Sequence, residues 1–335
     1  VAAAREHCQM AGDRVGDYHQ GLAALATASR AGAEGGHAMQ AGIAILSGLL
    51  GEFEGWEPSR GWARAVEMAQ VAERLGFAFV WVPDHLRVVE GPDDAPTFEA
   101  FTLLSAIAER TERVRLGPGV ACAGFRNPAL LVKMVTTLDV ASGGRVDLPL
   151  GAGWFEDEWQ SYGYGFPATR DRLAKLEETL EIASRMLGPS PATWRGEHFS
   201  VEDVITEPRG IQRPRIPLIV GGNGQRVTWR LAARFADELN LDGPTIADIG
   251  DWLPIIGQRC EEAGRDPATL PVSAQIWWDG ATGPARVEQL EQIAELGLAR
   301  IHSHLTEAAD SDEPLISFAE DCRAAGVELE TAPPA

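Results

Sequence analysis

Residues 114–154 constrain the fold more than any other part of the chain. They read VRLGPGVACAGFRNPALLVKMVTTLDVASGGRVDLPLGAGW, which is an apolar run, a segment with apolar residues at helical spacing, and a second apolar run. Pro128 just inside the helical segment and the glycines after it predict a helix over residues 127–141. Two strands joined by a crossover helix form a βαβ unit, which predicts a parallel sheet.

Both predicted strands of this unit end in glycine-rich turns, at residues 117–119 and 151–154. The carboxyl ends of parallel strands are where α/β folds place their functional sites. Glycine at such an end lets the backbone approach a flat ligand closely. Local pattern alone leaves two interpretations open, a ligand site or a pair of tight turns.

The same alternation of strand and helix continues along most of the chain and predicts a (β/α)8 TIM barrel of the α/β class. A doubly wound open sheet is the alternative, but it would carry a GxGxxG turn after the first strand, and residues 42–51 contain none. Residues 188–217 predict an insertion between the fourth helix and the fifth strand, lying over the barrel mouth. The predicted strands are 41–47, 78–82, 114–121, 146–150, 218–221, 238–241, 271–277 and 300–304, and the predicted helices are 62–75, 97–110, 127–141, 169–187, 223–236, 245–263, 283–296 and 313–325.

Composition and charge narrow the class of protein. The 335 residues suit one barrel domain over residues 39–330, preceded by an extension at 1–38 that we expect to be poorly ordered. A net charge of −20 argues against nucleic-acid and membrane partners. Four scattered cysteines without a CxxC pair indicate free thiols and a cytoplasmic protein. We expect no transmembrane helix, and residues 22–28 are too short an apolar run for a signal peptide.

The segment LGPGVACAGFRNPALLVKMVTTLDVASGGR followed by LGAGW closely resembles the bacterial luciferase-like superfamily of flavin- or deazaflavin-dependent TIM-barrel oxidoreductases. The resemblance extends from about residue 41 to about residue 327. The segments LGAGW, IVGG and RLAARFAD are most similar to the actinobacterial branch that uses the deazaflavin coenzyme F420. The resemblance implies a homodimer and hydride transfer between F420 and a small organic substrate. An FMNH2-dependent monooxygenase served by a separate flavin reductase, and a flavin-binding protein without turnover, remain alternatives.

Asp84 and His85 follow the second predicted strand. A histidine there can donate or accept a proton near neutral pH, and Asp84 can orient it or bind a cofactor ring. The residues alone favour a helix cap and a packed histidine. The resemblance favours the catalytic interpretation, because the superfamily places an Asp-His or Glu-His pair at this position in the flavin site.

The resemblance also implies a cofactor channel at the ends of the third and fourth strands. It predicts a non-prolyl cis peptide between Gly119 and Val120 that supports the ring. Asn127 caps the following helix or bonds the pyrimidine edge of the ring. The residues expected to line the channel are Gly151, Ala152, Gly153 and Trp154. Trp154 stands where the superfamily's sugar-phosphate dehydrogenases carry an acidic glutamate, which argues against such a substrate.

A second glycine-rich turn opens the helix after the fifth strand. Free N–H groups and the helix dipole favour a phosphate there, and Arg226 can add a charge-assisted contact. FMN and F420 both carry a phosphate, so this turn does not separate them. The residues of the predicted phosphate site are Gly221, Gly222, Asn223, Gly224 and Arg226.

Several other residues stay open at this point. His302 and His304 alternate along the eighth strand, but no third ligand is suitably spaced, so we predict no metal site. Asp147 and Pro149 are unusual in an internal strand, and Pro149 lacks a ladder donor. Cys122 either packs or faces the cofactor. Four tryptophans line an aromatic substrate pocket or pack in the core: Trp154, Trp194, Trp277 and Trp278.

Overall fold

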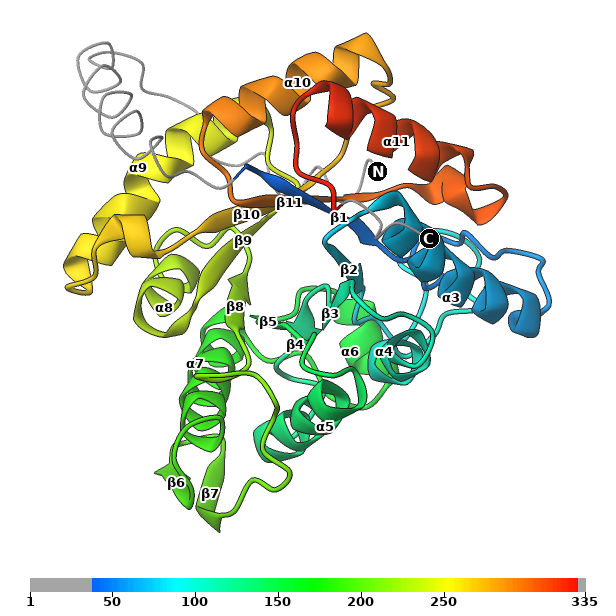
Figure 1. Cartoon of the computed structure of the whole chain (residues 1–335). Helices are drawn as coiled ribbons and strands as arrows, with labels where there is room; N and C mark the ends of the chain where they lie inside the picture. The colour runs from blue at the N-terminus through cyan, green and yellow to red at the C-terminus, as the bar shows by residue number, and fades with distance from the viewer. Residues whose placement is uncertain (1–37, 331–335) are drawn as a thin grey trace. The chain divides into compact units, whose positions relative to one another are not determined.

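The computed structural model describes residues 38–330, so nearly all of the predicted extension 1–38 lies outside the described residues. The described part is built on one nine-stranded sheet in which every neighbouring pair is parallel (Figure 1). The strand order is β3-β2-β1-β11-β10-β9-β8-β5-β4. The strands are β1 (Gln40–Ala44), β2 (Phe79–Val82), β3 (Arg115–Pro118), β4 (Ala121–Cys122), β5 (Leu148–Gly151), β8 (Leu218–Gly221), β9 (Glu238–Asp242), β10 (Val272–Ile276) and β11 (Arg300–His304).

The sheet closes into a barrel between β3 and β5. Leu116 forms a parallel bridge with Val146, just before β5, while β4 pairs with β5 directly. β3 and β4 are thus two halves of one barrel strand, and the ring has eight strand positions. The predicted TIM barrel is confirmed.

Helices cover the outer side of the ring (Figure 1). Local signals set their ends: Asn127 caps α5, and Thr245 and Asp248 form a capping box on α9. The helix predicted over residues 97–110 begins later, at Ala100, where Glu99 caps α4 by accepting from the Thr102 amide at 2.7 Å. None of the described helices is long and apolar enough to cross a membrane. The helices are α3 (Pro58–Leu75), α4 (Ala100–Ala108), α5 (Pro128–Ala141), α6 (Glu156–Ser161), α7 (Thr169–Met186), α8 (Thr228–Phe235), α9 (Ile246–Glu262), α10 (Pro284–Glu295) and α11 (Glu313–Ala324).

Two large aromatic side chains, Phe79 and Trp81 of β2, fill part of the barrel interior and are fully buried. Glycines on the flanking strands make room for them. A Cβ at Gly42 would lie 2.6 Å from the Phe79 ring, and a Cβ at Gly117 would lie 3.0 Å from the Trp81 indole nitrogen. Close packing therefore explains why glycine interrupts these otherwise apolar strands.

Asp147, which is unusual for an internal strand, belongs to a buried charge network. Its Oδ2 accepts from Arg300 at 2.9 Å, its Oδ1 binds Arg115, and Arg300 also pairs with Glu238 at 2.8 Å. Burial alone would raise the pKa of the Asp147 carboxyl, but the two guanidinium groups outweigh it and hold the pKa below its usual value. Two arginines balance two carboxylates, which is what allows charges inside the barrel.

Pro149 is accommodated by the break in the opposing strand. Asp147 donates its backbone N–H to Leu116 of β3 at 2.8 Å, and the Gly151 carbonyl accepts from Ala123, beyond β4, at 2.9 Å. Pro149 lies between these two points and faces the interruption between β3 and β4. A missing N–H there removes no ladder bond, so the proline does not distort the strand.

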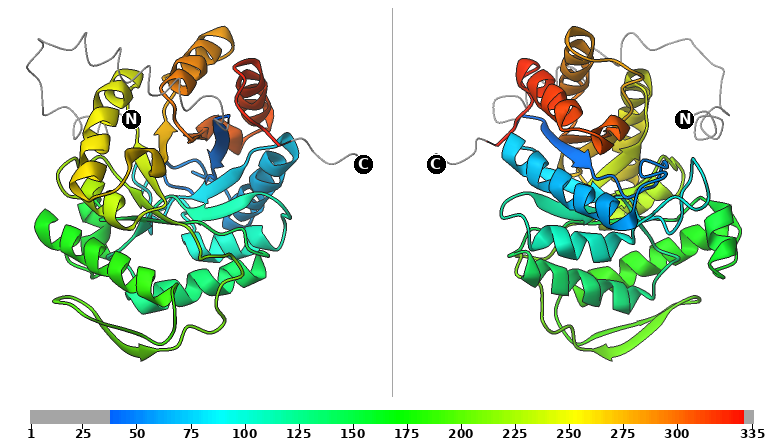
Figure 2. Two further views of the ribbon diagram at one scale, coloured as in Figure 1. Left: turned by 60° about the vertical axis from the view of Figure 1, so that its left-hand side comes forward. Right: turned by 90° about the vertical axis from the view of Figure 1, so that its right-hand side faces the viewer.

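The insertion 188–217 is present, but its predicted place over the barrel mouth is wrong. It contains the antiparallel hairpin β6 (Ala192–Arg195) and β7 (Ser200–Val204), which lies on the outer side of α5 and α7 (Figure 2). Gln212, near its end, donates to the Val146 carbonyl at 2.6 Å and accepts from Arg115 at 3.0 Å. Because Arg115 begins β3 and Val146 precedes β5, this segment covers the amino ends of the strands.

Candidate active site

The loop after β2 carries Asp84 and His85 on the carboxyl face of the barrel. Asp84 is buried and accepts from both Nη groups of Arg126, at 2.7 and 2.8 Å, and from the Cys122 amide at 2.9 Å. Burial would lower the pKa of Arg126, but Asp84 and then Glu99 outweigh it and raise that pKa. Asp84 therefore ties the end of β2 to the end of β4, and it is Arg126, not His85, that it contacts.

His85 is paired with Glu158 instead, a residue that the sequence did not single out. Its Nδ1 lies 3.1 Å from Glu158 Oε2, and the other carboxylate oxygen accepts the backbone N–H groups of Leu86 and Arg87. The Glu158 side chain is only 1% exposed. It comes from α6, a six-residue helix that the apolar pattern did not predict.

This arrangement fixes the imidazole. An ionised carboxylate only accepts hydrogen bonds, so this contact suits the tautomer of His85 that carries its proton on Nδ1. Nε2 is left to exchange a proton with a bound molecule. The ring stands edge-on to Trp154, with centroids 5.8 Å apart at 70°, and Trp154 itself is 52% exposed. His85 is thus half-buried beside Trp154, and the exposed part of Trp154 can contact a ligand.

The predicted cis peptide between Gly119 and Val120 is present, where β3 gives way to β4. The half-buried Val120 side chain packs over Gly151 and Gly221. A Cβ at either glycine would lie 2.8 Å from a Val120 methyl group. The structure therefore brings together three predicted site residues from three strands, and the glycines are needed so that Val120 can occupy this place.

The turn after β5 packs against β4. Gly153 has a φ of +79°, and a Cβ there would meet the Cys122 sulfur at 2.6 Å. Burial raises the pKa of the Cys122 thiol to about 12, and the side chain packs with Phe125 and Trp159. The packing interpretation of Cys122 is therefore supported. Ala152, which precedes Gly153, is half-buried and packs against the main hydrophobic core.

Asn127 is exposed and caps α5, since its Oδ1 accepts from the Ala129 amide at 2.9 Å and the Leu130 amide at 3.4 Å. The predicted cap is confirmed, and a contact with a cofactor ring stays a prediction.

The glycine-rich turn after β8 is organised differently from the prediction. Asn223 does not start the helix. Its side-chain NH2 donates to the Asp242 carbonyl at 2.7 Å, and its Oδ1 accepts from the Asp242 backbone N–H at 3.0 Å. α8 begins only at Thr228, and no side chain caps it. Gly222 has a φ of +123°, while Gly224 and Arg226 are exposed. The uncapped amides keep a phosphate site as a prediction, with Asn223 acting as a link between loops.

Asp242, at the end of β9, is a further residue that the sequence analysis missed. Part of its side chain is exposed, yet the surrounding protein limits hydration of the carboxyl and raises its pKa, while His85 acts in the opposite direction. No strong sequence pattern marks a lone aspartate at a strand end.

The two histidines of β11 lie in the barrel wall. His302 is buried, and burial lowers its pKa to about 3, so it stays neutral. His304 Nε2 lies 2.7 Å from Glu52 Oε1, and its ring stacks on Trp277. Within residues 38–330, the structure contains no cluster of three or more His, Cys, Asp or Glu side chains arranged for a metal.

The four tryptophans separate into two groups. Trp154 and Trp277 follow β5 and β10 and are partly exposed. Trp194 belongs to the hairpin and packs under Arg185, 4.4 Å from its guanidinium carbon. Trp278 is buried against Phe318 of α11. Of the tryptophans that follow a strand, Trp154 and Trp277 are therefore partly exposed, whereas Trp278, just after β10, is buried.

Comparisons with known proteins agree with this architecture. The family model described as luciferase-like monooxygenase matches residues 39–296. An F420-dependent glucose-6-phosphate dehydrogenase of Kineococcus radiotolerans is 28% identical over 262 residues, covering 75% of this chain and 75% of that protein. An FMNH2-dependent dimethylsulfone monooxygenase of Pseudomonas putida is 26% identical over 183 residues, covering 55% of this chain and 49% of that protein. A solved F420-dependent secondary alcohol dehydrogenase, in complex with an F420-acetone adduct, has the same fold, with a TM-score of 0.71 at 20% identity over 86% of this chain and 99% of that chain.

Proposed function

The chain belongs to the luciferase-like monooxygenase family, and from this premise we propose that it transfers a hydride between coenzyme F420 and a small organic substrate. The family supports a flavin- or deazaflavin-dependent oxidoreductase or monooxygenase in general. The similarity to the F420-dependent dehydrogenase of Kineococcus covers more of this chain than the similarity to the FMNH2-dependent enzyme of Pseudomonas. That difference favours F420 over FMN.

The residues on the carboxyl face fit a flat, three-ring cofactor. Val120 is half-buried and packs over Gly151 and Gly221, so the part of it that remains exposed could support one face of a ring. The uncapped amides before α8, together with Arg226, would hold a phosphate. When bound, the ring would supply or accept a hydride at its C5.

One observation carries the proposal: the buried Glu158 carboxylate holds the His85 imidazole with Nε2 free. Adding a hydride to a substrate leaves an electron pair that needs a proton, and removing a hydride requires a proton to leave. His85 would move that proton at Nε2, while Glu158 keeps the ring oriented.

Aromatic side chains near His85 indicate the character of the substrate. Trp154 and Phe155 both lie against the imidazole, at centroid distances of 5.8 and 6.3 Å. We expect the substrate to present an apolar body to them. Trp154 replaces the glutamate of the family's sugar-phosphate dehydrogenases, so a sugar phosphate is disfavoured.

Fluorescence titration of the full chain with F420 and with FMN tests the proposal. We expect F420 to bind at least about tenfold more tightly, which corresponds to about 1.4 kcal/mol. Tighter binding of FMN would refute F420 dependence and support a monooxygenase with a separate reductase, which oxygen uptake would then test. Binding of neither would refute the proposed site.

A His85→Gln variant separates binding from chemistry. It should retain cofactor affinity, because the imidazole acts on the substrate, and should lose turnover by about a hundredfold or more. Glu156→Gln is the matched control on the same helix, since Glu156 is exposed and contacts Gln160. Unchanged turnover in the His85 variant, measured with any substrate found by screening, would contradict the assignment.

A further inference from the structure

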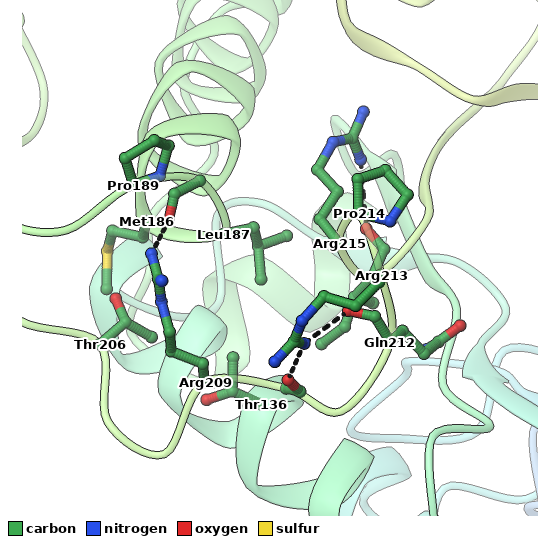
Figure 3. Close-up of a pocket in the computed structure, with 13 residues that line it drawn as sticks. Thr136, Met186, Leu187, Pro189, Thr206, Arg209, Gln212, Arg213, Pro214 and Arg215 are labelled. Atoms are coloured by element: carbon green, nitrogen blue, oxygen red, sulfur yellow. Dashed lines mark hydrogen bonds between the residues drawn. The ribbon is translucent and has the colours of Figure 1, made fainter.

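A pocket of about 290 Å³ lies between the end of α7 and the segment that leads into β8. Its apolar walls come from Met186, Leu187 and Ile216, and arginine side chains stand around it (Figure 3). The volume is near the lower end of that of ligand pockets, about 300–1,000 Å³. The pocket is independent of the candidate active site, because the same segment covers the amino ends of β3 and β5.

The guanidinium groups of Arg209 and Arg213 have no acidic partner among the described residues, although the Arg209 backbone N–H donates to Glu207 Oε2 at 3.3 Å. Arg209 donates to the Gly188 carbonyl, and one Nη of Arg213 donates to the carbonyls of residues 210–212 at 2.7–3.0 Å. Within the described part of the chain, neither guanidinium forms an ion pair with a carboxylate. Each guanidinium has five donors, so several N–H groups remain available. In contrast, Arg215 at the same pocket is paired with Asp237 at 2.6 Å.

Thr206 supplies a second, independent observation. Its side chain lines the pocket and is only 3% exposed, and its hydroxyl has no hydrogen-bond partner among the described residues. A buried hydroxyl without a partner is unfavourable. The Thr206 oxygen is enclosed by neighbouring atoms, so a bound molecule would remove that penalty only by displacing a nearby side chain. Figure 3 shows Thr206, Met186 and Arg209 on one side of the pocket and Arg213 on the other, where Arg213 donates to main-chain carbonyls.

We propose that this pocket binds a small phosphate ester with an apolar body. The exposed guanidinium groups of Arg209 and Arg213 offer donors at this pocket, and the enclosed Thr206 hydroxyl would add one if a ligand uncovered it. A tetrahedral phosphate presents three terminal oxygens to such donors, whereas a planar carboxylate presents only two. The apolar walls would then receive the organic part of the ester. The chain carries a net charge of −20, so anion binding requires a local concentration of positive charge such as this one.

Binding in this pocket should also affect the amino ends of the barrel strands. Gln212 lines the pocket and contacts Asp139, Val146 and Arg115 at 2.6–3.0 Å. A ligand that orders residues 209–216 should therefore slow amide hydrogen exchange in this segment and at the start of β5.

Calorimetric titration of the full chain with phenyl phosphate tests the proposal. We expect saturable binding, with weaker binding of inorganic phosphate and of benzoate. The double variant Arg209→Gln/Arg213→Gln should raise the Kd by about tenfold or more. The control is Arg195→Gln/Arg230→Gln, which removes the same charge from exposed arginines elsewhere and should change the Kd by less than about twofold.

Thr206→Val gives a second, isosteric test that leaves the charge unchanged. It should weaken phenyl phosphate binding by about threefold to tenfold without unfolding the protein, because it removes only an unpartnered hydroxyl. Equal Kd values in the two double variants, or no binding of phenyl phosphate to the wild type, would overturn the proposal. F420 titration of the same variants should be unchanged, so failure here is distinguishable from failure of the proposed function.

Discussion

Replacing Glu158 by glutamine should both loosen the loop after β2 and free the His85 ring. The carboxylate accepts three donors: the Leu86 amide, the Arg87 amide and the His85 imidazole. A glutamine side chain has the same shape but only one accepting oxygen. Its NH2 group must face either the two amides or the imidazole. If the NH2 group faces the two amides, N–H groups oppose N–H groups inside the protein. If it faces the imidazole, the ring must change tautomer so that Nδ1 can accept.

The magnitude follows from these contacts. Hydrogen bonds to charged groups contribute about 1.5–3 kcal/mol, and those between neutral groups about 0.5–1.5 kcal/mol. Losing the charge across three bonds, and leaving one donor unmatched, should lower the free energy of unfolding by about 3 kcal/mol. For a domain of about 290 residues, whose entropy of unfolding is about 0.6 kcal/mol/K, that corresponds to a fall in Tm of roughly 5 °C.

Two measurements on the full chain check this prediction. Thermal and urea unfolding report the loss of stability, with Glu156→Gln as the control on the exposed side of α6. Nitrogen-15 NMR of the histidines, assigned with the His85→Gln variant, reports which ring nitrogen carries the proton. The wild type should show the Nδ1-protonated form, and the Glu158→Gln variant should lose it.

The reasoning would be refuted by a Glu158→Gln variant that unfolds like Glu156→Gln and keeps the wild-type His85 tautomer. In that case the carboxylate would neither support the loop nor orient the imidazole. A loss of stability with an unchanged tautomer would contradict only the positioning of His85.

Three further predictions concern other parts of the barrel. Gly151→Ala should weaken cofactor binding by about tenfold, because its Cβ would meet Val120 at 2.8 Å. Adding Val120→Ala should restore part of the lost affinity, and additive losses of affinity in the titration would contradict this. Asp147→Asn should cost about 3–5 kcal/mol in urea unfolding, against no measurable change for Glu202→Gln of an exposed pair. Because the folded-state pKa of Asp147 lies below its usual value, its stabilising effect is complete above the unfolded-state pKa of about 3.9 and is lost as the pH falls through the folded-state pKa; a wild type no more acid-sensitive than the variant would disprove this. Cys122 should resist iodoacetamide in the native protein, since its thiol is buried and its pKa is raised to about 12, and mass spectrometry showing rapid native labelling would argue against that environment.

The order of strands and helices was determined largely by local sequence, because helix and strand signals act over a few residues. β8 and β11 have the predicted bounds, and α5 begins at the predicted cap with Pro128 in its first turn. The cis peptide before Val120 was likewise anticipated, through family resemblance rather than local physics. The barrel fold follows from this alternation, since parallel strands need crossover helices.

The contacts that make the candidate site were decided only by the tertiary structure. Glu158 lies 73 residues from His85, on a helix too short to produce a periodic signal, so nothing local indicated that the two would pair. Asp147 and Arg300 are separated by 153 residues, and each appears unfavourable until the barrel brings them together. The insertion could be predicted by its length, but its place at the amino ends of the strands depends on Gln212 meeting Asp139 and Val146. Periodicity reports which face of an element is buried, whereas the partner of a buried charge depends on chain closure over long distances.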